Sequence, residues 1–175
     1  MSLEQRRTRI TLTGAMLVLA LGTLAAAWAF QLIGGYIPCK LCLQERLPYY
    51  AGIVLLIAAL GLDSLRPSAS LARMSIALAS LVFLVGAVLG ARHAGVEYGW
   101  WEGPSDCGSA GGATAVTAEA LLQQLEGIRV VSCSEASWRF PAGWGPSFAG
   151  WNALLSAALV LLGVAALRAR TDRAR

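Results

Sequence analysis

A Cys-x-x-Cys motif is the part of this sequence whose residue types are best suited to chemistry. It lies in the run Pro38-Cys39-Lys40-Leu41-Cys42-Leu43-Gln44-Glu45-Arg46. Two thiols at this spacing can close a small disulfide ring, and a helix N-terminus at the motif would favour the thiolate. If a helix has begun by Cys42, Arg46 follows one turn later on the same face, where its charge can lie beside the Cys42 sulfur. The motif predicts redox chemistry with Cys42 activated, although an arginine near a helix end also commonly reaches lipid head groups.

The other two cysteines, Cys107 and Cys133, allow all four thiols to pair. By itself, such a pair in an extramembrane segment predicts a structural disulfide. The Cys-x-x-Cys motif elsewhere in the chain favours exchange between the two pairs instead. A closed zinc site would need all four cysteines to converge, because His93 is the only histidine. We therefore expect no metal site.

The elements that must position these cysteines are four apolar runs, at about 10–35, 43–62, 74–92 and 148–167. The chain is 57% hydrophobic and 14% charged, whereas soluble domains average about 25% charged residues. A helix crosses the bilayer with about 20 apolar residues, so the second run suffices only if its helix also includes Leu41 to Arg46. The pattern predicts an all-α membrane protein, a four-transmembrane-helix bundle forming a single integral membrane domain over 1–175.

The first run could instead be a cleaved signal peptide, because Ala25-Ala26-Ala27 resembles a cleavage site. The apolar stretch continues past these alanines, which favours a membrane span. In the third run, Gly86 and Gly90 are small enough to allow close helix contact.

Arginines predict the orientation of the bundle. Nine of the 14 basic residues lie in the two tails and in the loop between the second and third runs: Arg6, Arg7, Arg9, Arg66, Arg73, Arg168, Arg170, Arg173 and Arg175. The positive-inside rule places these segments, and so both termini, in the cytoplasm. The net charge of +4 thus reflects topology and not nucleic-acid binding. The cysteine loops, about 36–42 and 93–147, then face an oxidising compartment, for which the bacterial periplasm is the natural candidate.

Two features of the second loop leave alternatives open. Apolar residues from Val116 to Ile128 recur at helical spacing, which predicts a short helix lying either on the bilayer or on its own loop. His93, at the end of the third run, could contact a cofactor head group or cap its helix. The sequence contains no haem motif, dinucleotide fingerprint or iron–sulfur motif, so elimination leaves a lipid-soluble electron acceptor such as a quinone.

The motif with its arginine, and Cys107 and Cys133 between the third and fourth runs, resemble the disulfide bond formation protein B (DsbB) family of bacterial thiol:quinone oxidoreductases. DsbA, DsbB and quinone keep the bacterial periplasm oxidising. The resemblance covers essentially the whole chain. It implies an inner-membrane enzyme that reoxidises a DsbA-like thioredoxin-fold protein, reduces ubiquinone or menaquinone, and returns the electrons to the respiratory chain as quinol.

The same resemblance implies a role for each site residue. Cys107 would form the mixed disulfide with the partner, and Cys133 would pair with Cys107 at rest and exchange with Cys39. Cys42 would face the quinone as a thiolate, with Arg46 polarising a quinone oxygen. His93 matches the histidine that the family carries at the end of its third span.

Two other classes of protein remain as alternatives. A vitamin K epoxide reductase-like enzyme also has four spans with paired loop cysteines, but its Cys-x-x-Cys is expected late in the bundle and not after the first span. A membrane protein without enzymatic activity could hold structural or metal-binding cysteines, and stoichiometric zinc in the purified protein would identify it.

Overall fold

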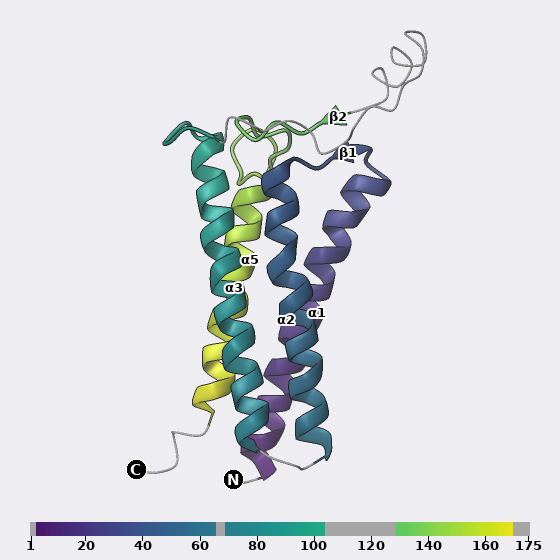
Figure 1. Ribbon diagram of the computed structural model, residues 1–175, viewed down its shortest axis with the longest axis vertical. Coiled ribbons are helices and arrows are strands. Elements are labelled where there is room, and N and C mark those ends of the chain that lie inside the picture. The colour runs from purple at the N-terminus through teal and green to yellow at the C-terminus, as the bar shows by residue number, and fades with distance from the viewer. Residues whose placement is uncertain (1–2, 66–68, 104–128, 170–175) are drawn as a thin grey trace.

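The computed structural model describes residues 3–65, 69–103 and 129–169 (Figure 1). They form a bundle of four long helices, α1 (Leu3–Leu32), α2 (Lys40–Leu65), α3 (Ala69–Glu97) and α5 (Phe148–Arg168). All four are long and apolar enough to cross a membrane. The protein is thus a four-span helical membrane protein, as predicted. Cys107 and the predicted helix at 116–128 lie outside the described residues.

Each helix packs against two neighbours, so that α1 and α3 both lie between α2 and α5. Met16, Leu56, Phe83 and Leu159 fill the centre, and none of them is exposed. Many large apolar side chains point outward instead, among them Val18, Val54, Leu81 and Leu161. Such a surface would be unfavourable in water but suits the hydrocarbon of a bilayer.

A close helix contact involves Gly90 of α3. A Cβ atom at Gly90 would lie 2.7 Å from the backbone nitrogen of Ala153 and 3.0 Å from the carbonyl oxygen of Ala149, both in α5. At Gly86 a Cβ would lie 3.1 Å from the Ser156 hydroxyl. Both glycines therefore allow α3 and α5 to approach closely, in the role predicted from their size.

The helix ends differ from the predicted runs where the cysteine motif begins. Helix α1 ends at Leu32, before the predicted limit of 35, and Gly35 follows with a φ of 68°, which favours glycine. Helix α2 begins at Lys40, so Leu41 to Arg46 belong to the helix, as its required length predicted.

Two short strands join segments that are distant in sequence. Strand β1 (Tyr36–Ile37) pairs in parallel with β2 (Arg129–Val130), with Ile37 opposite Val130. The amide of Val131 continues the pairing by donating to the Ile37 carbonyl at 3.2 Å. The pair lies at the end of the bundle opposite the start of α1 and the end of α5 (Figure 1). It brings the chain just before Cys39 beside the chain just before Cys133, a pairing that we did not predict.

Candidate functional site

Cys39 is the N-cap residue of α2. Its carbonyl accepts the first helical hydrogen bond, from the Leu43 amide at 3.1 Å. Its sulfur accepts a hydrogen bond from the Cys42 amide at 3.2 Å, the position that a serine or aspartate oxygen usually occupies at a helix start. The sulfur therefore lies at the positive end of the helix dipole, which favours its thiolate.

Neighbouring side chains favour the same charged form. The Cys42 sulfur lies 2.8 Å from the Cys39 sulfur, and His93 Nε2 lies 3.9 Å from it. These hydrogen bonds, that of Cys42 above all, outweigh the effect of burial and lower the pKa of Cys39 to about 4. When the pair is reduced, Cys39 is thus held as a thiolate at neutral pH.

A buried polar chain continues from Cys39 across the bundle. His93 Nδ1, from α3, lies 2.7 Å from Glu45 Oε1, from α2. The other carboxylate oxygen of Glu45 accepts a hydrogen bond from Asn152 Nδ2, from α5, at 2.9 Å. His93 is 2% exposed and Glu45 8%. The carboxylate fixes the imidazole with Nε2 toward the Cys39 thiol. A thiol, an imidazole and an acid in this order can transfer a proton to or from the sulfur.

Cys133 packs against Cys39. Cys39, Leu41 and Cys133 form one buried cluster, and Cys42 packs against it. Cys133 is part of a disulfide, whereas Cys39 and Cys42 are free thiols. The pairing of β1 with β2 thus places a disulfide next to a reduced Cys-x-x-Cys motif, as disulfide exchange between them requires.

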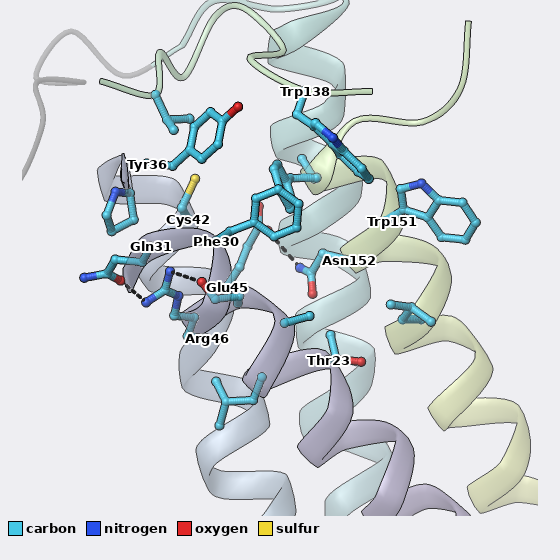
Figure 2. A pocket seen from close by; sticks show the side chains of 18 of the residues that line it. Thr23, Phe30, Gln31, Tyr36, Cys42, Glu45, Arg46, Trp138, Trp151 and Asn152 are labelled. Carbon is cyan, nitrogen blue, oxygen red and sulfur yellow. Dashed lines mark hydrogen bonds between the residues drawn. The ribbon is translucent and has the colours of Figure 1, made fainter. Parts of the chain in front are cut away.

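A cavity of about 270 Å³ opens beside Cys42 (Figure 2). Its volume is close to the lower end of the range for small-molecule sites. Helices α1, α2 and α5 and the segment after β2 enclose it, and most of its wall is apolar. Phe30 is central to this wall, with its ring 4.2 Å from that of Phe148 and 5.3 Å from that of Trp138. Helices α1, α2 and α5 also contribute polar side chains to its lining, among them Gln31, Cys42, Glu45, Arg46 and Asn152.

The family model of disulfide bond formation protein DsbB matches residues 8–166. The chain belongs to the DsbB family. No match to a curated protein or to a solved structure was found. Membership makes the protein a membrane oxidoreductase of disulfide bond formation, and it favours this family over the vitamin K epoxide reductase-like alternative.

In this DsbB-family protein, Arg46 lines the cavity together with Cys42. Its guanidinium donates to Gln31 Oε1 at 2.6 Å (Figure 2). It also donates to the Ala27 carbonyl at 3.2 Å and lies 5.3 Å from the ring centre of Trp28. No hydrogen bond joins Arg46 to Cys42 among the described residues. Acceptors on α1 engage the guanidinium, and activation of Cys42 by Arg46 stays a prediction. The hydrogen bonds of the motif converge on the Cys39 sulfur instead.

His93 also has a different neighbour from those considered. It contacts Cys39 and Glu45, and it is not among the residues that line the cavity. A contact with a cofactor head group and a capping role were the two alternatives, and the contacts of His93 with Cys39 and Glu45 suggest a third.

Sequence reasoning overlooked Glu45 and Asn152. Glu45 follows Cys42 by three positions, one helical turn, so its spacing could have identified it. Asn152 is a polar residue in the first turns of the fourth apolar run, where a polar side chain in a membrane span often has a function. Cys107, the fourth predicted site residue, lies outside the described part of the chain.

Proposed function

We propose that this protein reoxidises a reduced thioredoxin-fold dithiol protein of the periplasm, similar to DsbA, and passes the electrons to membrane quinone. The observation that carries the proposal is the position of the Cys39–Cys42 pair between two partners. Cys133, in a disulfide, packs against Cys39, and Cys42 lines the cavity. A dithiol between a disulfide and a cavity is arranged to relay two electrons.

The cavity suits a quinone by its shape and by its donors. Aromatic and aliphatic side chains supply faces for a planar ring and an isoprenoid tail, and most of the lining comes from the membrane-spanning helices α1, α2 and α5. Arg46 has further N–H groups besides those bound to Gln31 and Ala27, and these could donate to a ring oxygen. When bound, the quinone accepts two electrons and two protons and leaves as quinol, which returns the electrons to the respiratory chain.

The cysteines divide the thiol chemistry among them. The partner's thiolate attacks Cys107, and the bond from Cys107 to Cys133 breaks as the mixed disulfide forms. The released Cys133 thiolate then attacks the Cys39 sulfur of an oxidised Cys39–Cys42 disulfide, so that Cys42 leaves as a thiolate at the cavity. The partner's second thiol releases its disulfide product and frees the Cys107 thiolate. Cys107 then attacks Cys133, which restores the bond between them and releases Cys39 as a thiolate. The two electrons of the partner now lie on reduced Cys39 and Cys42.

His93 and Glu45 manage the proton at Cys39. Re-forming the bond between Cys39 and Cys42 requires the Cys39 sulfur as a thiolate, because the thiol is a poor nucleophile. Nε2 of His93, 3.9 Å away, is placed to take up that proton, and Glu45 stabilises the charged ring that results. We therefore give His93 a role in proton transfer at sulfur, in place of one at the quinone ring.

The membrane orientation belongs to the same proposal. The described arginines Arg6, Arg9 and Arg168 lie at the end of the bundle opposite Cys39, which supports a cytoplasmic location for that end. The cysteine end would then face the periplasm of a bacterial inner membrane.

The test is quinone reduction by the purified full-length protein in detergent. A reduced thioredoxin-fold periplasmic dithiol protein is supplied, and the loss of quinone absorbance is followed with ubiquinone and menaquinone in parallel. Cys42→Ser and Cys107→Ser should both abolish the reaction, whereas Ser134→Ala, an exposed neighbour of Cys133, should leave it unchanged. If the wild type consumes neither quinone while its thiols stay inert toward the partner, the proposal is wrong.

A further inference from the structure

Three potential metal ligands meet at the cysteine end. The sulfurs of Cys39 and Cys42 and a ring nitrogen of His93 all lie within 4.8 Å of one another. In tetrahedral zinc sites, Zn–S bonds of about 2.3 Å and Zn–N bonds of about 2.0 Å place the ligand atoms about 3.5–3.8 Å apart. The 3.9 Å between Cys39 Sγ and His93 Nε2 exceeds the S···N value by only about 0.3–0.4 Å. The two sulfurs, now 2.8 Å apart, would need to separate by about 1 Å.

The surroundings of His93 match those of a metal ligand. Metal-binding histidines nearly always donate their second ring N–H to a carboxylate or carbonyl, which fixes the nitrogen that faces the metal. Glu45 accepts from Nδ1 in this way and is itself held by Asn152. Both carboxylate oxygens of Glu45 are thus engaged, and the imidazole presents Nε2 toward the sulfurs.

Charge favours a cation at this place as well. Two thiolates would neutralise a divalent ion, so the buried complex of metal and thiolates carries no net charge. Arg46 is turned away, with its guanidinium bound to Gln31 and Ala27 of α1. The guanidinium of Arg46 is thus engaged by α1 and not by the two sulfurs.

We propose that reduced Cys39 and Cys42, together with His93, bind one Zn²⁺ or a similar thiophilic ion. Oxidation of the pair to its disulfide, with the quinone of the proposed function or an added thiol oxidant taking up the two electrons, releases the ion. Binding displaces the remaining protons of the two thiols and leaves one coordination position for water. His93 takes the place of Cys107 and Cys133, both of which the sequence argument had required for a zinc site. Because the Cys42 sulfur lines the cavity, a bound ion would also block electron transfer there.

The test is zinc binding by the full-length protein in detergent, measured without quinone or partner. The reduced protein is titrated with Zn²⁺ against a chromophoric chelator. We expect one tight equivalent in the reduced wild type and none after oxidation of the Cys39–Cys42 pair. His93→Ala should weaken binding at least tenfold and Glu45→Gln by roughly tenfold, since loss of an outer-shell partner costs about 10–100-fold in affinity. Gln44→Ala, an exposed neighbour of Glu45, is the matched control and should bind like the wild type.

Two outcomes would overturn the proposal. Equal zinc binding by the reduced and oxidised proteins would mean that the metal binds elsewhere. Unchanged zinc affinity in a folded His93→Ala protein would mean that the two cysteines bind the ion without His93. X-ray absorption at the zinc edge of the wild type needs no variant. We expect two sulfur ligands and at least one imidazole nitrogen, and a shell without imidazole would contradict the proposal. A negative result leaves the proposed quinone reduction untouched, because that reaction is measured without added metal.

Discussion

Each end of the bundle buries a network of charged and polar side chains, and only one of the two networks ends at a group that can react. At the end where α1 begins, Arg9 donates through two nitrogens to both carboxylate oxygens of Asp63, and each residue is 4% exposed. Arg6 donates to the Asp63 carbonyl, and Thr13 donates to the Arg9 carbonyl at 2.8 Å. At the cysteine end, the chain from Asn152 through Glu45 to His93 ends on the Cys39 sulfur, a nucleophile beside a disulfide and a cavity.

The difference shows how burial serves structure at one end and chemistry at the other. Arg9 and Asp63 neutralise each other in a bidentate contact that joins α1 to α2. The hydrogen-bonded residues at the cysteine end come from three helices, α2, α3 and α5, and they end at the sulfur of Cys39, which can still react. We therefore expect changes at the first end to alter stability and changes at the second to alter reactivity.

The largest effect should come from removing the nucleophile. Cys39→Ser leaves the polar chain without its sulfur, and quinone reduction with a reduced dithiol partner should fall by at least about a thousandfold, because a hydroxyl cannot form the disulfide. The free energy of unfolding should change little. Turnover and thermal unfolding in detergent measure the two quantities. Retention of a tenth of the activity would mean that Cys39 is not in the electron path.

Breaking the ion pair of Arg9 and Asp63 should lower stability and leave the activity of the folded protein largely unchanged. Asp63→Leu strands a buried arginine and should lower the free energy of unfolding by about 3–5 kcal/mol. Replacing both partners, as Arg9→Met with Asp63→Leu, should recover most of that loss, since no unpaired charge remains. Unfolding in mixed detergent micelles is the measurement, with activity per folded molecule as the control. If Asp63→Leu lowered the activity of folded protein as much as it lowered stability, the two ends would not be separable.

A smaller effect is expected when the polar chain is weakened but its shape is kept. Glu45→Gln removes the charge that stabilises a protonated His93, and the rate of quinone reduction should fall by roughly a hundredfold, in the usual range for proton-transfer groups. The pH dependence of the rate should shift as well, which a merely structural role would not produce. Gln44→Ala is again the matched control. If the Glu45→Gln protein had a wild-type rate and pH profile, the hydrogen-bonded residues Asn152, Glu45 and His93 would have a structural role only.

The smallest effect at neutral pH concerns the acidity of Cys39. Because its pKa is about 4, well below the ordinary value of 9.0, the reduced protein should hold this thiolate from neutral pH down to about pH 5 and protonate it as the pH falls through 4. The stability that the thiolate contributes should likewise decline as the pH falls through that pKa. Removing the main hydrogen bond in Cys42→Ala should raise the pKa of Cys39. Thiolate absorbance during a pH titration tests this, and an unshifted curve in Cys42→Ala would contradict the assigned cause.

Local sequence was enough to determine the four spans. A helix in hydrocarbon must satisfy its backbone hydrogen bonds within itself, so each span is visible as a run of about 20 apolar residues. The same local logic extended α2 back through Leu41 to Arg46 and placed the motif at its start. The position of Glu45, one turn after Cys42, was equally accessible but was overlooked.

The partners of each functional side chain were decided by the tertiary structure. Cys39 meets His93, 54 positions away, because α3 returns to the same end of the bundle. Arg46 lies at the right helical spacing from Cys42, yet its guanidinium turns to Gln31 and Ala27 of α1. Helical spacing specifies the face of a helix on which a residue lies, but the acceptors on neighbouring helices decide where a long, flexible side chain binds. The pairing of β1 with β2, two residues in each strand, was likewise too short to predict, and it places Cys133 beside Cys39.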